Sequence, residues 1–192
     1  MVEEKQQEAI ILNIMQHKKI NTMNEILLIS EKTLKENGVI NNNVDNMYIF
    51  PAIHYAQDAG LQPIIGTKLY NRLMDMVEDG TIGNNKDYKY LLDEYVTPYL
   101  INKVTADIQI PLAYKVRNQG VVQQTGENTY VPSLKDLQYV IQNYENKANF
   151  YSNRLSDYLK ANRKKYSEYC SVDSSADMPS NKNAYNTGIY LG

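Results

Sequence analysis

The chain has 192 residues, of which 20 are Lys or Arg and 22 are Asp or Glu, so its formal net charge is −2. This near balance excludes a general electrostatic attraction to nucleic acid or to an acidic membrane surface. The single cysteine, Cys170, excludes an internal disulfide and a zinc site built from several cysteines. No apolar stretch approaches the roughly 18 residues needed to cross a bilayer, so we expect no membrane partner.

The length predicts one domain with an extension at each end. Residues 1–24 are predicted to form an N-terminal arm or short helix, and residues 25–170 the helical domain. Residues 171–192 lack periodicity, are rich in Ser, Asn and Asp, and predict a flexible C-terminal tail. The expected fold is therefore mainly α: a helical bundle of four to five principal helices, with one β-hairpin insert (about 119–132) and extended terminal arms.

The first half of the domain predicts three helices, each opening at a Ser, Asp or Thr that suits a helix start. These opening residues are Ser30, Asp45 and Thr67. Pro51 lacks a backbone donor, so we expect it to kink the second helix or to delay its start. Gly60 is expected to end that helix, and the apolar residues 61–66 (LQPIIG) are expected to form a tight connection to the third helix.

The second half of the domain predicts two long helices. The first covers residues 88–117 and is divided by Pro98 and Pro111, so we expect bends or restarts near both prolines. The second covers residues 134–166 and opens with Ser133 and Asp136, whose spacing predicts an approximate capping box.

Between these helices, residues 119–133 (QGVVQQTGENTYVPS) have the composition of a small β-hairpin. The β-forming side chains are Val121, Val122, Tyr130 and Val131, and residues 125–128 supply the turn. A two-stranded ribbon is marginally stable alone in water, so we expect it to lean on the helices or on another chain. Two hypotheses stay open: the hairpin projects toward a partner protein, or it folds back and caps its own bundle.

The last helix carries the most regular apolar pattern of the chain, with spacings that alternate between three and four residues. The positions are Leu134, Leu137, Ile141, Tyr144, Ala148, Tyr151, Leu155 and Tyr158. Such a seam needs one long partner face, which either the same bundle or a neighbouring subunit supplies. The chain has 17 Tyr against 2 Phe and no Trp, and Tyr suits both cores and half-hydrated subunit interfaces.

At the end of the tail, apolar β-forming residues return. They are Thr187, Ile189, Tyr190 and Leu191. An arm that pairs with the strand edge of another chain uses such residues, whereas the alternative is a frayed terminus. We predict that these four residues and the four β-formers of the hairpin bind partner proteins.

No residue set predicts catalysis, a cofactor or a metal ion. His17 and His54 have no ligand-like neighbours in sequence, and the acidic cluster Asp75, Glu78 and Asp79 is typical of solvated charge. Glycine-rich phosphate loops, GxSxG and HExxH are absent. An enzyme whose site is shared between subunits is a weaker alternative. The basic residues between Lys160 and Lys165 complement a helix dipole, or they contact an acidic partner or nucleic acid.

The order of elements resembles the head–tail connector proteins of tailed bacteriophages, also called head-completion or adaptor ring proteins. The segments that carry the resemblance are ISEKTLKENGVINNNVD, YIFPAIHYAQDAGLQPIIGTKLYNRL and YLLDEYVTPYLINKVTADIQIPLAY, followed by NQGVV, TYVPS and the last helix. The resemblance covers roughly residues 26–169 and includes an LxPxxG-like turn between two helices, here within residues 59–70. Together with the Asn-rich composition, the resemblance suggests a crAss-like phage of a Bacteroides-type host.

The resemblance implies a structural virion protein that is made in the host cytoplasm and located at the portal vertex, or neck. Its expected partners are other copies of itself in a ring, usually twelve-fold, the portal protein, and further neck or tail ring proteins. DNA would pass through the ring without sequence-specific binding, and a slightly acidic chain suits such a passage. The alternative function is that of a helical nucleic-acid-binding or regulatory protein of phage or bacterial origin.

Overall fold

The computed structural model describes residues 26–117, 120–123, 133–169 and 177–180. In chain order the elements are α2 (Glu31–Asn37), α3 (Asn46–Tyr55), the π-helical turn η1 (Ala56–Leu61), α4 (Gln62–Ile65), α5 (Thr67–Glu78), the 3-10 turn η2 (Ile82–Asn84), α6 (Lys86–Leu91), the π-helical turn η3 (Leu92–Val96), α7 (Thr97–Asp107), α8 (Gln109–Ala113), β1 (Tyr114–Arg117), β2 (Gly120–Gln123) and α9 (Leu134–Ala161). The predicted mainly-α class is confirmed.

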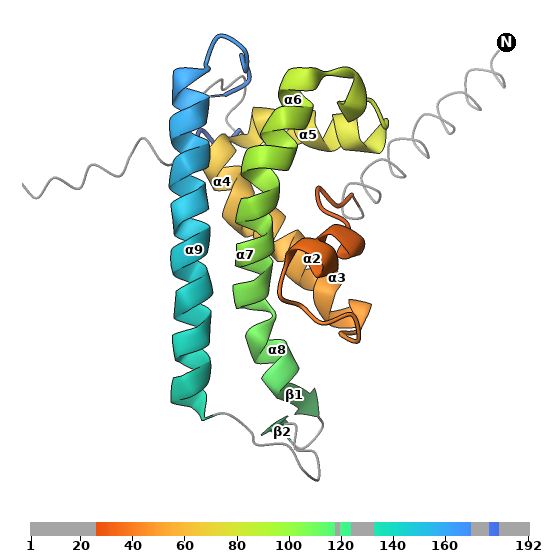
Figure 1. Ribbon diagram of the computed structural model, residues 1–192, viewed down its shortest axis with the longest axis vertical. Helices are drawn as coiled ribbons and strands as arrows, with labels where there is room; N and C mark the ends of the chain where they lie inside the picture. The colour runs from red at the N-terminus through yellow and green to blue at the C-terminus, as the bar shows by residue number, and fades with distance from the viewer. Residues whose placement is uncertain (1–25, 118–119, 124–132, 170–176, 181–192) are drawn as a thin grey trace, which may run out of the picture.

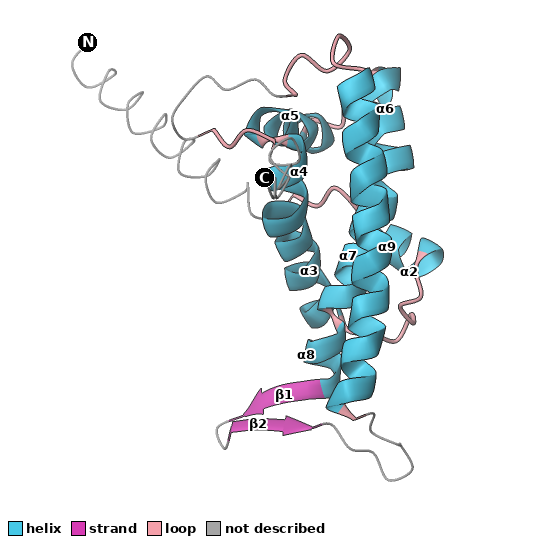
Figure 2. Ribbon diagram, turned by 90° about the vertical axis from the view of Figure 1, so that its left-hand side faces the viewer, coloured by secondary structure: helices cyan, strands magenta, loops and turns pink. Residues whose placement is uncertain are grey.

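The helices form an elongated bundle in which α7 lies in the middle (Figure 1). Helix α9 packs along one side of α7, and α2 and α3 lie on the other side. Helices α5 and α6 stand at one end of the bundle, and strands β1 and β2 lie at the opposite end (Figure 2). Buried apolar side chains of α3, η1, α5, α7 and α9 make up most of the core.

The predicted helix starts are confirmed where a side chain caps them. Ser30 Oγ accepts a hydrogen bond from Thr33 N at 3.0 Å. Asp45 Oδ1 accepts one from Met47 N at 3.1 Å. Ser133 and Asp136 form a complete capping box, in which each side chain accepts a hydrogen bond from the backbone of the other.

The prediction that Gly60 ends a helix is wrong. The chain stays helical from α3 through η1 and α4 to Ile65, so residues 61–65 are helix and not a tight connection. Gly60 serves packing instead, because a Cβ atom there would lie 2.5 Å from the Tyr99 hydroxyl. In the same turn, the buried Gln57 side chain accepts a hydrogen bond from Leu28 N (2.6 Å) and donates one to Ile26 O (3.2 Å), which fixes the segment before α2.

The helix predicted for residues 88–117 begins at Lys86 and ends at Ala113. Pro98 lies in the first turn of α7, directly after the π-helical turn η3. Its missing N–H leaves the Glu94 carbonyl without its α-helical donor, and Arg154 Nη1 of α9 donates to that oxygen at 3.4 Å. The guanidinium also lies 4.7 Å from the Tyr95 ring centroid.

The prediction of helix for residues 114–117 is also wrong, because they form strand β1. This strand pairs antiparallel with β2, and the register places Tyr114 opposite Gln123 and Arg117 opposite Gly120. The hairpin of the described residues therefore begins before the predicted insert at 119–132. Tyr130 and Val131, predicted as its second strand, lie outside the described residues.

The apolar seam of the last helix packs mainly against α7. Leu137, Ala148 and Leu155 are buried, the tyrosines of the seam are half-buried, and Leu134 is exposed. The sequence pattern did not include Ser152 and Ser156, which are buried beside Ala148. Ser156 Oγ donates to Ser152 O at 2.9 Å, so its hydroxyl is satisfied within the helix. Small side chains at these positions permit close approach of α9 to the elements on which it packs, mainly α7 and η3.

Lys103 connects α7 and α9 by charge. Its Nζ lies 2.9 Å from Asp107 Oδ1 on α7 and 2.7 Å from Glu145 Oε1 on α9. Burial opposes the charge of Lys103, but its hydrogen bonds with Glu145 and Asp107 outweigh burial and raise its pKa. Burial raises the pKa of Asp107, whose Oδ2 accepts no hydrogen bond within the described part of the chain.

Tyrosines join the far end of α9 to α6 and η3. The Tyr95 and Tyr158 rings stack at 4.1 Å between centroids, and Tyr88 meets Tyr166 edge-on at 5.4 Å. The Tyr166 hydroxyl donates to Asp87 O at 2.9 Å. Because this bond uses its only proton, Tyr158 must be the donor in the 3.1 Å hydroxyl pair with Tyr166. These tyrosines serve the interior of one chain.

Residues 177–180, which we name the strap, lie against the start of α5. Thr67 N donates to Met178 O, and Met178 N donates to Thr67 Oγ1, both at 2.9 Å. Ser180 Oγ donates to the Tyr169 hydroxyl at 3.2 Å. Gly66 allows this approach, because a Cβ atom there would lie 3.3 Å from Met178 O. The strap belongs to the predicted tail, yet hydrogen bonds fix it to the bundle.

We expect Gly66→Ala to lower the free energy of unfolding by about 1–3 kcal/mol, because φ +82° and ψ 154° form a backbone conformation essentially restricted to glycine. For a chain of this size, that loss lowers the melting temperature by several degrees. Gly83→Ala is the matched control, since its Cβ would meet no atom within 4 Å. If the thermal melts of the two variants superimpose, this role of Gly66 is contradicted.

We expect stability to decline as the pH rises from about 10 to 12. Burial, with the nearby Glu168, raises the pKa of Tyr88 to about 12, and burial raises the pKa of Tyr166 in the same direction. Unfolded tyrosine ionises near pH 10, so above this pH the unfolded state binds fewer protons than the folded state. Stability is therefore complete below pH 10 and is lost above it.

Denaturant titrations across this pH range, followed by helical circular dichroism, measure the decline. Tyr166→Phe should reduce the pH dependence, whereas Tyr139→Phe should leave it unchanged because Tyr139 is 75% exposed. Equal pH dependence in the wild type and in Tyr166→Phe would show that this tyrosine does not contribute.

Candidate interaction surfaces

The structure places part of the predicted partner-binding set. Val121 and Val122 lie on strand β2 at the hairpin end of the bundle. Tyr130 and Val131 lie outside the described residues, as do Thr187, Ile189, Tyr190 and Leu191. Of the eight predicted residues, only Val121 and Val122 therefore lie in the described part of the chain.

Exposed apolar side chains accompany the hairpin at this end. Ile110 of α8 is 55% exposed, Leu134 at the start of α9 is 58% exposed, and Val140 is 38% exposed. Helix α8 runs directly into β1, and α9 begins at the same end of the bundle as the strands (Figures 1 and 2). We name Ile110, Leu134 and Val140 the hairpin-end patch. Helices α8 and α9 contact each other, and exposed apolar patches are typical of protein-binding surfaces.

Two members of this patch were not predicted from the sequence. Ile110 was expected within a helix that bends or restarts near Pro111, with no exposure assigned to it, and Val140 lies beside the apolar seam and does not belong to it. Leu134 was part of the seam, but α7 and α8 do not cover it. The sequence did contain one signal for this patch: the start of the last helix has more large apolar residues than a single seam requires.

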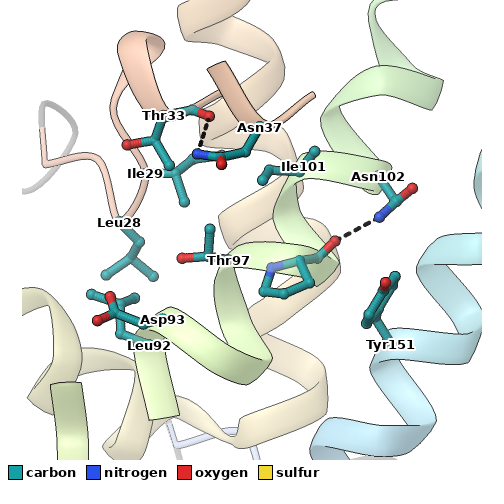
Figure 3. A pocket seen from close by; sticks show the side chains of 11 residues that line it. Leu28, Ile29, Thr33, Asn37, Leu92, Asp93, Thr97, Ile101, Asn102 and Tyr151 are labelled. Carbon is teal, nitrogen blue, oxygen red and sulfur yellow. Dashed lines mark hydrogen bonds between the residues drawn. The ribbon is translucent and has the colours of Figure 1, made fainter. Parts of the chain in front are cut away.

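A cavity of about 480 Å³ lies between the segment before α2, the continuous helical segment of η3 and α7, and α9 (Figure 3). Its lining includes the amides of Asn37 and Asn102, which could in principle bind a ligand. However, Asn37 Nδ2 donates to Thr33 O at 3.1 Å, and Asn102 Nδ2 donates to Pro98 O at 2.8 Å. Each amide therefore uses one of its two N–H groups within its own helix, and we assign no ligand to the cavity.

The titratable residues considered from the sequence do not converge. Asp75, Glu78 and Asp79 are exposed at the end of α5, and His54 is half-buried on α3. The described residues contain no group of three or more His, Cys, Asp or Glu side chains that could hold a metal ion. Among the described helices, none combines the length and apolar character that a membrane span requires.

The basic residues at the end of α9 are partly paired with acids. Lys165 Nζ lies 3.2 Å from Asp87 Oδ1, and Lys160 Nζ lies 3.8 Å from Asp157 Oδ1. Arg163 and Lys164 are exposed in the turn that follows the helix. Pairs this exposed contribute little to stability, so this turn presents positive charge to solvent.

Comparison with known proteins gives a family but no function. The model of a family of unknown function, DUF6712, matches residues 61–178. This match starts at the last residue of η1 and ends within the strap, so it includes both partners of the contact between Thr67 and Met178. No curated protein and no solved structure matches the chain. Since the family model covers more than half of the sequence, the chain belongs to DUF6712, a family of unknown function.

Proposed function

We propose that this protein is a structural component of a tailed-phage virion, where it forms a ring between the portal protein and the tail. In this role it binds further copies of itself, in a ring that the resemblance suggests is twelve-fold. It also binds the portal protein and the next neck or tail ring. DNA passes through the ring, and the protein does not bind a particular sequence.

The observation that carries the proposal is the hairpin-end patch. Three large apolar side chains, Ile110, Leu134 and Val140, face solvent at the end of the bundle where β1 and β2 lie. A surface of this kind suits a protein partner, and a hairpin beside it offers strand edges for pairing. The resemblance of the element order to head–tail connectors supports this class of partner.

The predicted arms extend this proposal. Val121, Val122, Tyr130 and Val131 would contact the neighbouring ring from the hairpin end. Thr187, Ile189, Tyr190 and Leu191 would also bind a partner protein, and they follow the strap in the sequence.

A second candidate function is nucleic-acid binding or regulation. The exposed Arg163 and Lys164 favour it, because they stand beside Lys165 and Lys160 at one end of α9. If the wild-type chain binds duplex DNA at moderate salt and the double variant Arg163→Glu/Lys164→Glu does not, this function is favoured over the structural one.

The proposed function predicts that the chain cosediments with the portal protein encoded in the same genome. Leu134→Asp should weaken this binding by about tenfold or more, since it places a charge at the centre of an apolar contact. Leu134 is the first residue of α9, where an acidic side chain is compatible with the helix. Loss of binding would therefore not reflect loss of folding, and a thermal melt verifies this.

Val39→Asp is the matched control, because Val39 is 67% exposed and lies in the connection between α2 and α3. This variant should bind the portal as the wild type does. A genome without a portal gene, or a portal protein that leaves the wild-type chain in the supernatant, would refute the proposed function. Equal losses for Leu134→Asp and Val39→Asp would refute the role of the hairpin-end patch.

A further inference from the structure

The cavity of about 480 Å³ has apolar side chains from several elements in its lining (Figure 3). Its volume lies in the range of pockets that hold a ligand. Contact between water and apolar side chains is unfavourable, so a segment that brought further apolar side chains into the cavity would stabilise the fold. The apolar lining consists of Leu28 and Ile29 before α2, Leu92 of η3, Pro98 and Ile101 of α7, and Tyr151 of α9.

A second hollow adjoins this cavity on the side of α9. Asn102 of α7 and Tyr151 of α9 line both, so the two hollows lie next to each other. The rest of the second hollow is lined by α9 alone, with Asn143, Asn146, Lys147 and Phe150. We name the two hollows together the groove. It extends from the segment before α2 to the exposed side of α9.

The two ends of the groove differ in charge. Asp93 lines only the cavity, and Figure 3 shows it beside Leu28. It pairs with Lys89, but both side chains are about half exposed, and a pair this exposed is weak. Lys147 lines only the second hollow, whose described lining residues include no carboxylate. A segment that crosses the groove therefore meets an acid at one end and a base at the other.

The sequence that leads into the groove has a matching pattern. The described chain begins at Ile26, two residues before the lining residue Leu28, and the Gln57 side chain holds both. Before Ile26, residues 9–15 (AIILNIM) form an apolar run, preceded by three Glu and one Lys in residues 3–8 and followed by Lys18 and Lys19. The spacing of the large apolar residues predicts one apolar side of a helix. These residues are Ile10, Ile11, Ile14 and Met15.

We infer that residues 9–15 of the same chain fill the groove, with their apolar side against Leu28, Ile29 and Ile101. An amphipathic helix that places its apolar side in an apolar groove is a common mode of recognition. Met15 precedes Ile26 by 11 residues, which span up to about 36 Å when extended, so the run can return to a groove that begins at Leu28. The inference does not depend on the proposed function.

Charge and chain continuity give this segment the same direction. Lys18 and Lys19 are the part of the segment nearest in sequence to Leu28, and Asp93 lies at the Leu28 end of the groove. The acidic residues before the run then lie toward Lys147 at the other end. A tethered segment acts at an effective concentration in the millimolar range. The chain's own segment is therefore favoured over the same segment of a second copy.

Site-directed cross-linking tests the position of the segment. Cys170, the only cysteine of the sequence, is first replaced by Ser. In this background the double variant Ile11→Cys/Thr97→Cys is treated with a short bis-maleimide, since Thr97 lies in the cavity (Figure 3). We expect a cross-link within one chain, identified as a species of monomer mass whose digest contains the joined peptides.

The control has a cysteine within similar reach of the segment but outside the groove. Ala59 is exposed and lies two residues after Gln57, whose side chain accepts the bond from Leu28 N. Ile11→Cys/Ala59→Cys should give a several-fold lower yield of intrachain cross-link. Equal yields from the two pairs, or no cross-link to Thr97, would overturn the inference. Cross-linked dimers in place of monomers would show that a second copy's segment fills the groove, and would overturn the assignment to the same chain.

Thermal melts give a second, independent test. Ile11→Asp/Ile14→Asp should lower the melting temperature by several degrees, because it places two charges against apolar side chains. Gln6→Asp/Gln7→Asp adds the same charge before the apolar run and should melt as the wild type does. Equal melting temperatures for the two variants would contradict burial of the run. None of these measurements involves the portal protein, so their failure is distinct from failure of the proposed function.

Discussion

The contact between α7 and α9 is the constraint on which the rest of the structure depends. Ala148, Ser152 and Ser156 are small buried residues of α9, and Lys103 adds a charged link from α7 to Glu145. Close approach of this kind requires that every buried polar group find a partner. The Ser156 hydroxyl does so within α9, whereas Asp107 retains one buried oxygen without a donor among the described residues. With α7 fixed in this way, its other side is free to receive η1 and α3.

Features set by neighbouring residues could be predicted from the sequence, and features set by distant ones could not. The caps at Ser30, Asp45 and Ser133 each depend on a bond spanning two or three residues, and all three are present. Gly60 was misjudged because its environment comes from Tyr99, and Gly66 acquires its role from Met178, 112 positions along the chain. Residues 114–117 were misassigned because Tyr and Val there pair with β2, and helix periodicity does not report pairing.

The candidate surfaces show the same division. β-forming residues directed attention to the hairpin, where Val121 and Val122 do lie on a strand. The abundance of tyrosine left both a core role and subunit contacts open, and Tyr88, Tyr158 and Tyr166 contact one another inside their own chain, where Tyr166 also bonds to the backbone. The exposed aromatics that remain available are identified only once α7 shows which side of α9 is covered. A sequence pattern gives the periodicity of a helix but not the number of its faces that have neighbours.

The π-helical turn η3 makes the bundle sensitive to the length of the chain at one point. A π-turn accommodates one residue more than an α-helical turn does, and here it immediately precedes Pro98. Deleting one residue from Leu92–Val96 would restore regular α-helix and rotate α6 by about 100° relative to α7. Tyr88 and Leu91, which are now buried, would then leave their positions although neither had been substituted. Among related chains, an insertion or deletion at η3 would therefore change the packing of this end of the bundle more than most substitutions there.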